Sequence, residues 1–250
     1  MTRATLLACG ALLIGTGCRV ERPYPPPTAE ELRAHVAHMD DAVRTLRAET
    51  RVEFTTTKGR VHATVMLIAA QERLRLDILS PIGTTLQTMV VDGDSYALLD
   101  VEHGRFERGD ARSCGIRILP IALSPGDASR ALRGGTPLLD GPSEVSWDAR
   151  AGAEVLRVHA DDGRTQEIRL VGDRGRWRLL RNEVHDARGQ SELLLEPLDG
   201  AIRIRSQTRA ESIEIRFRRA ESNVDLADAV FHLTPPPGVE IRENVVCDRR

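Results

Sequence analysis

The sequence predicts a mainly β fold with helices (α+β), built as an open, curved antiparallel sheet, or half-barrel, under an N-terminal helix and a short internal helix. Three observations predict it. Apolar and polar residues alternate in successive segments from Arg51 onward. Turn pairs such as Asp92-Gly93 and Asp199-Gly200 separate these segments at hairpin spacing. Strands recur without intervening βα units, which favours a curved sheet over a doubly wound fold.

The chain begins with a predicted export signal. Arg3 precedes an apolar run from Leu6 to Ile14, which is too short to span a bilayer, and small residues lead to Cys18. The stretch Gly15-Thr16-Gly17-Cys18 resembles the bacterial lipobox. That resemblance implies that residues 1–17 are a lipoprotein signal peptide and that Cys18 carries the lipid anchor. An ordinary signal peptide with an incidental cysteine is the alternative.

Residues 18–27 are charged and proline-rich, which predicts an extended, lipidated tether. Residues 28–250 are expected to form a single domain. The formal net charge is −2, and it becomes −3 without residues 1–17, whose only charged residue is Arg3. Because both signs are interspersed, the chain is not expected to bind nucleic acid. Cys114 and Cys247 could form a disulfide or remain two free thiols.

Two helices are expected. The capping box Thr28-Ala29-Glu30-Glu31 opens the first. An apolar stripe then predicts a helix of about five turns, through Leu32, Val36, Met39, Val43 and Leu46. The second covers residues 125–133, because Ser124 is a good N-cap, proline follows it, and Gly134-Gly135 ends the segment.

Period-two alternation places the strands between and after these helices. Most should be half-buried, with one apolar face. They are expected at residues 61–67, 74–78, 86–91, 96–101, 155–159, 168–171, 176–181, 191–196, 201–207 and 212–218.

Three segments carry a family resemblance. Residues 73–83 and residues 109–137, with their Leu-Pro-Ile turn, resemble the LolB family of outer-membrane lipoprotein receptors. Residues 230–241 resemble the closing strand of the wider superfamily, which includes the periplasmic carrier LolA. The chain looks like a divergent member of the LolA/LolB superfamily. The resemblance implies a concave apolar face that holds the acyl chains of lipids or lipoproteins. It also implies a lipid-anchored protein of the outer membrane that faces the periplasm, with a periplasmic LolA-like carrier as partner.

The resemblance directs attention to the inward positions of the alternating strands. Their alternative role is ordinary core packing. The expected lining of the lipid cavity is Val61, Val65, Leu74, Leu76, Ile78, Leu86, Ile202 and Ile204, with Leu132 on the lid. In this family the apolar residue of a proline-x-glycine turn protrudes into the membrane, and Ile82 occupies that place. An exposed turn residue without a function is the other interpretation.

No pattern of catalysis is present in the sequence. There is no GxSxG, HExxH or Cys-His signature, so an enzyme, a metal site and a cofactor are not expected. We expect a monomer that acts as an acceptor or carrier of acyl chains in lipoprotein localisation. The alternative is a structural lipoprotein that uses the same fold to bind a protein partner in envelope assembly.

Overall fold

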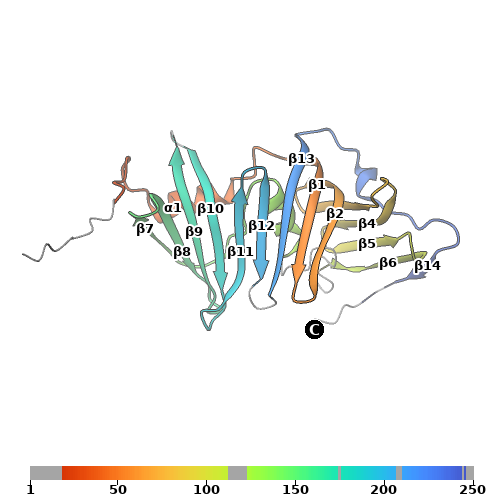
Figure 1. Cartoon of the computed structure of the whole chain (residues 1–250). Helices are drawn as coiled ribbons and strands as arrows, with labels where there is room; N and C mark the ends of the chain where they lie inside the picture. The colour runs from red at the N-terminus through yellow and green to blue at the C-terminus, as the bar shows by residue number, and fades with distance from the viewer. Residues whose placement is uncertain (1–18, 112–122, 174–175, 207–209, 244, 246–250) are drawn as a thin grey trace, which may run out of the picture.

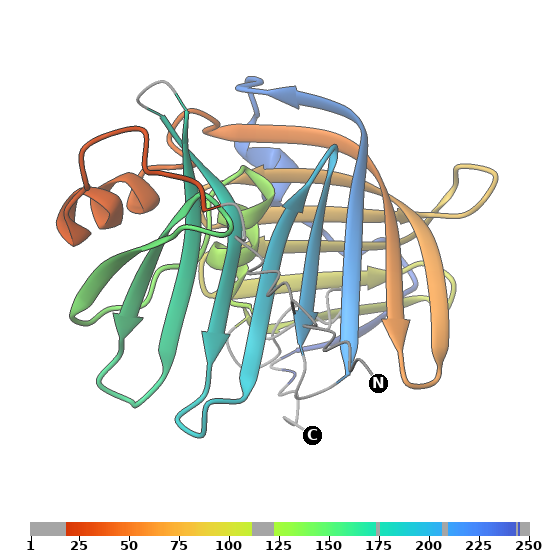
Figure 2. The ribbon, with the colours of Figure 1, turned by 60° about the vertical axis from the view of Figure 1, so that its left-hand side comes forward.

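The computed structural model describes residues 19–111, 123–173, 176–206, 210–243 and 245. Within them, all strands belong to one 14-stranded sheet in the order β14-β6-β5-β4-β3-β2-β1-β13-β12-β11-β10-β9-β8-β7. Neighbouring strands are antiparallel, except that β14 runs parallel to β6. Because β7 and β14 are free edges, the sheet stays open, and it bends strongly (Figures 1 and 2). The predicted open, curved sheet is confirmed.

The bounds of the elements are as follows. The helices are α1 (Ala29–Ala37), α3 (Pro125–Leu132) and the 3-10 helix η1 (Asp228–Phe231). The strands are β1 (Thr45–Thr56), β2 (Gly59–Ala70), β3 (Arg73–Leu79), β4 (Thr85–Asp92), β5 (Ser95–Asp100), β6 (Arg105–Asp110), β7 (Ser143–Asp148), β8 (Ala153–His159), β9 (Thr165–Asp173), β10 (Arg176–His185), β11 (Ser191–Leu198), β12 (Ala201–Ser206), β13 (Glu211–Ser222) and β14 (Glu240–Arg242).

The two faces of the sheet carry different elements. On the inner face, α1 contacts β7 and β8, and α3 contacts β2 and β3 (Figure 2). Leu32 of α1 and Leu132 of α3 join the inward side chains of the sheet in one hydrophobic cluster. On the outer face, η1 packs Phe231 against Val90 in a second, smaller cluster. The main core therefore lies inside the bend.

The first helix is shorter than the sequence predicts. The capping box is present: the Glu31 backbone N–H donates to Thr28 Oγ1, and the Thr28 N–H donates to the Glu31 carboxylate. However, α1 ends at Ala37 and β1 already begins at Thr45, so the prediction of five turns is wrong. Met39 and Val43 still pack against the core, but they do so from turns.

The second helix agrees closely with its prediction. Ser124 Oγ accepts from the Asp127 N–H, Pro125 is the first helical residue, and the helix ends at Leu132, one residue early. Strands β1, β6 and β7 were not predicted. Residues 230–241, expected to resemble a closing strand, instead contain the end of η1 and the short strand β14.

The segment expected to be an extended tether is not free. Its first residues lie against the β7–β8 turn, where the Val20 N–H donates to the Ala149 carbonyl at 2.8 Å. The predicted anchor Cys18 and the cysteines Cys114 and Cys247 lie outside the described residues.

Candidate functional site

The inner face of the sheet is the candidate site, because alternation gathers its apolar side chains there. The strand register aligns Ala69, Leu67 and Val65 of β2 with Leu74, Leu76 and Ile78 of β3. In the same way Ile204 of β12 lies opposite Ile213 of β13. These side chains belong to one continuous cluster of buried residues that extends across the sheet from Tyr96 of β5 to Leu156 of β8, so the bend encloses a single apolar surface.

A buried ion pair ties the lid helix α3 to the rest of the domain. Arg133, at the C-terminal end of α3, places Nη2 2.6 Å from Asp40 Oδ2, and both side chains are more than nine-tenths buried. Its Nη1 also donates to the Val43 carbonyl at 2.9 Å. Gly135 allows its backbone to lie close to Asp40, since a Cβ at position 135 would lie 2.9 Å from the Asp40 Cβ. The lid is therefore held against the α1–β1 connection.

Two buried amides fix the segment that follows the lid. Gln166 donates to the Pro137 carbonyl and to Asn182 Oδ1, while its own Oε1 accepts from the Leu139 N–H. Asn182 donates to Thr136 Oγ1 at 2.6 Å and to the Pro137 carbonyl at 3.1 Å. Asn182 is fully buried, so these bonds satisfy groups that water cannot reach. They hold residues 136–139 across the inner face of β9 and β10.

One hollow remains open on the inner face, at β3 to β6. The register aligns Ile78, Gln87, Asp100 and Arg105 across these four strands, so their side chains share the inner face. The volume of the hollow is about 490 Å³, within the range of roughly 300–1,000 Å³ typical of ligand pockets. It is lined by Ile78, Gln87, Leu98, Asp100, Arg105, Glu107 and Arg242.

The hollow has an apolar part and a charged wall. Ile78 and Leu98 supply the apolar part. On the wall, burial opposes ionisation of Asp100, but hydrogen bonds from His103 and Arg105 outweigh it, so the pKa of Asp100 lies below its usual value. The Arg105 side chain donates through Nη2 to Asp100, whereas its buried Nε has no hydrogen-bond partner. The hollow is thus suited to an amphipathic ligand.

The predicted lining residues occupy several different environments. Only Ile78 lines the open hollow, and Leu86 is half-buried at the register shift between β3 and β4. Val61 lies near the β1–β2 hairpin and is 64% exposed. The remaining six are buried in the core cluster: Val65, Leu74, Leu76, Leu132, Ile202 and Ile204.

Sequence reasoning missed most of the hollow. Leu98 falls in a predicted strand, but its neighbours Ala97 and Leu99 are also apolar. The sequence pattern therefore did not show which of these side chains faces inward. Arg242 reaches the site only because β14 pairs with β6, a contact between distant segments. Ile82, proposed from the resemblance as a membrane contact, is 87% exposed in the β3–β4 turn.

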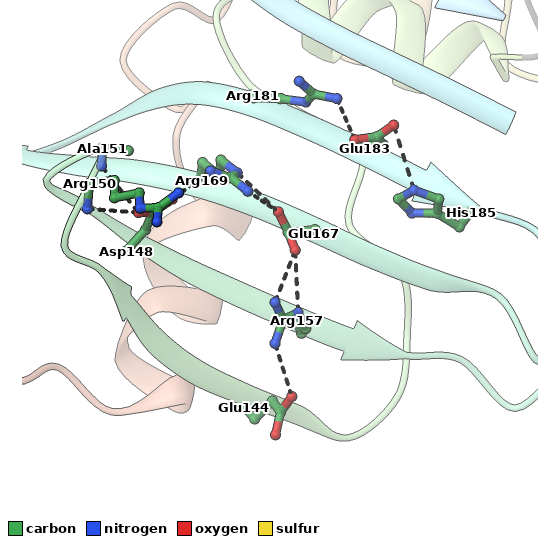
Figure 3. Close-up of polar contacts among 10 residues, drawn as sticks. All are labelled: Glu144, Asp148, Arg150, Ala151, Arg157, Glu167, Arg169, Arg181, Glu183 and His185. Atoms are coloured by element: carbon green, nitrogen blue, oxygen red, sulfur yellow. Dashed lines mark hydrogen bonds and ion pairs between the residues drawn. The ribbon is translucent and has the colours of Figure 1, made fainter. Parts of the chain in front are cut away.

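The outer face of β7 to β10 is polar and its charges are largely paired. Figure 3 shows ion pairs between strands, Arg157 with Glu167 and Arg169 with Asp148, and one within β10, Arg181 with Glu183. This polar face is unsuited to binding an apolar ligand. In the described part of the chain, no group of three or more His, Cys, Asp or Glu could hold a metal ion, and no helix is long and apolar enough to cross a membrane.

Comparison with solved structures identifies the fold. No family profile and no curated protein sequence matches the chain. A LolA superfamily protein from Nitrosomonas europaea is similar in structure, with a TM-score of 0.54 and 11% identity over 83% of this chain and 99% of that one. The chain therefore shares the fold of this protein.

Two further structures agree with this fold. One is an outer membrane lipoprotein-sorting protein domain from Vibrio parahaemolyticus, with a TM-score of 0.56 and 15% identity over 81% of this chain and 97% of that one. The other is a DUF1329 family protein from Desulfovibrio piger, with a TM-score of 0.55 and 13% identity over 82% of this chain and 95% of that one.

Proposed function

We propose that the inner face binds the acyl chains of a lipid or lipoprotein, and that the protein is an acceptor or carrier in lipoprotein localisation. One observation carries this proposal: a continuous apolar inner face that the lid covers only in part, leaving the hollow at β3 to β6. Acyl chains gain free energy in proportion to the apolar area that they bury, and this requires no catalytic group.

The hollow gives the ligand a direction. An acyl chain would lie along Ile78 and Leu98, with its polar end against Arg105 and Arg242. A longer chain would reach the predicted lining residues beneath α3, such as Leu74 and Leu76, when the lid moves away from the sheet.

The location of the protein belongs to the same proposal. The Vibrio parahaemolyticus structure is a lipoprotein-sorting domain, which supports a place in the cell envelope. We propose that Cys18 is the lipidated residue, that the domain faces the periplasm from the outer membrane, and that a periplasmic LolA-like protein delivers its ligand. The exposed Ile82 turn would then be an apolar contact with a membrane.

Native mass spectrometry of the purified chain tests the binding proposal. We expect co-purified lipid or acyl peptide, and about tenfold weaker binding of a fluorescent fatty acid when Ile78→Asn and Leu98→Asn are combined. Ile68→Asn is the matched control, because Ile68 is a half-buried residue on the outer face. A lipid-free chain whose fatty-acid affinity is equal in both variants contradicts the proposal.

A structural lipoprotein that binds a protein partner is the second candidate. It is favoured by the extent to which the chain itself covers the inner face and by the four charged residues of the hollow. In that case the chain would be free of lipid, and one protein would be recovered with it from membranes in a stoichiometric amount.

A further inference from the structure

Residues 19–24, named here the N-terminal strap, are bound to the end of the sheet that contains the β7–β8 turn. Besides the backbone bond from Val20 to Ala149, the Trp147 indole Nε1–H donates to the Val20 carbonyl at 3.0 Å. Figure 2 shows this segment running down to the upper end of β7 and β8. Its backbone is therefore held at two points, one in β7 and one in the β7–β8 turn.

A buried ion pair strengthens the attachment of the strap. Arg22 Nη2 donates to Glu154 Oε2 at 3.0 Å, and Arg22 Nε lies 2.7 Å from the other carboxylate oxygen. The Glu154 side chain is completely buried. The Arg22 guanidinium also lies over the Trp147 ring, 5.3 Å from its centroid. Loss of the strap would leave a buried carboxylate without its cation, which is strongly unfavourable.

Tyr24 fills an aromatic slot beside this ion pair. Its ring meets Trp147 and Trp177 edge-on, with centroids 6.2 Å and 5.2 Å away. Gly172 provides the space, since a Cβ at this position would lie 2.8 Å from Tyr24 Cε1. Independent polar, ionic and aromatic contacts therefore fix where the N-terminal end of the domain lies.

Four arginines are exposed at this end of the sheet, and we name them the basic rim: Arg19, Arg150, Arg176 and Arg178. Arg150 is in the β7–β8 turn, and Arg176 and Arg178 begin β10. The pairing of Glu154 with Leu170 and of Leu170 with Leu179 brings these turns to the same end of the sheet.

The basic rim differs from the arginines on the adjacent outer face. Arg157, Arg169 and Arg181 each have a carboxylate partner, whereas none of the four rim residues forms an ion pair within the described part of the chain. In the strap the exposed carboxylate is Glu21. Among the described residues, therefore, no ion pair neutralises the positive charges of the rim.

We propose that this end of the sheet binds a lipid surface that contains anionic headgroups. Guanidinium groups match phosphate in geometry and charge, and each basic residue at an anionic membrane surface strengthens binding about fivefold. The strap orients the surface, because its docking fixes Arg19, the first described residue, at the rim. The orientation rests on the proposed anchor at Cys18, whereas binding by the rim does not.

Vesicle co-sedimentation of the chain from Arg19 onward tests the proposal, because this form retains every described contact but carries no lipid. We expect binding to vesicles of equal parts phosphatidylcholine and phosphatidylglycerol, and none to phosphatidylcholine alone. Combining Arg150→Gln, Arg176→Gln and Arg178→Gln should weaken binding about a hundredfold. The matched control combines Arg47→Gln, Arg188→Gln and Arg219→Gln, which are also exposed and form no ion pair with a described residue.

Equal losses in the two triple variants, or no binding of the wild type, would overturn the proposal. If, in addition, only the rim triple variant failed to bind an acidic protein, that protein would be the partner of the rim. Binding of a fluorescent fatty acid should be unchanged in the rim variant, so failure of this inference is distinct from failure of the acyl-binding proposal.

Tryptophan fluorescence supplies an independent measurement. The chain contains two tryptophans, and both contact Tyr24 of the strap. If the rim lies against the vesicle, brominated lipids should quench their emission. Vesicle binding without quenching would place the contact elsewhere on the molecule and refute the proposal.

Discussion

At the level of a single residue, substitution of Ile82 tests the proposed contact with a membrane. The turn around it is held by other groups: the Gly83 N–H donates to the Ser80 carbonyl at 2.9 Å, and the Thr84 N–H donates to Ser80 Oγ at 3.1 Å. Ile82→Glu should therefore weaken membrane partition about tenfold and leave the melting temperature unchanged. Ile82→Leu is the control. A lowered melting temperature would show that Ile82 supports the fold instead.

Asp100 should make the stability of the hollow depend on pH. Its pKa in the folded protein is lower than the usual 3.8, so its stabilisation is present above that value and disappears as the pH falls through the lowered folded pKa. Asp100→Asn should be less stable than the wild type at pH 6, and the difference should shrink as the pH falls below 3.8. Urea unfolding at several pH values measures it, with Asp199→Asn in an exposed turn as control. A difference independent of pH would exclude ionisation of Asp100 as the cause.

At the level of elements, the chain between α1 and β1 shows why a periodic pattern can mislead. Met39, Val43 and Leu46 continue the helical stripe of α1, yet Leu46 and Ala48 are buried on alternate positions of β1. Strand β1 pairs with both β2 and β13, and these two ladders outweigh the local preference for helix. The start of α1 was predictable because its cap is local, whereas its end depended on distant partners.

The buried amides make the segment 136–139 sensitive to one substitution. Asn182→Leu should remove the partner of Thr136 Oγ1 and destabilise the protein by about 2 kcal/mol. Urea unfolding measures this loss. Hydrogen exchange at the Leu139 amide, which donates to Gln166, should become faster. Gln190→Leu, at an exposed turn, should change neither. Unchanged exchange at Leu139 would show that the amides do not control this segment.

At the level of the whole molecule, attachment to the membrane depends on the proposed anchor. Cys18→Ser should move the chain from the membrane fraction to the soluble fraction, because each acyl methylene that it loses contributes about 0.8 kcal/mol to membrane binding. Cys9→Ser should leave the distribution unchanged. Fractionation and immunodetection measure both. Continued membrane association of Cys18→Ser at high salt, where the basic rim is screened, would contradict lipidation.

The sequence by itself determined the mainly β class, the start of α1, most of α3 and ten of the strand segments. Each depends on contacts between near neighbours in the chain, such as the Thr28–Glu31 cap and the alternation of apolar residues. Only the tertiary structure decided that Arg22 meets Glu154, that Arg242 joins the hollow through β14, and that six expected lining residues, with Leu132 of the lid among them, are buried in the core. These contacts join residues far apart in the sequence, and their geometry is set by the curvature and pairing of the whole sheet, which no local pattern encodes.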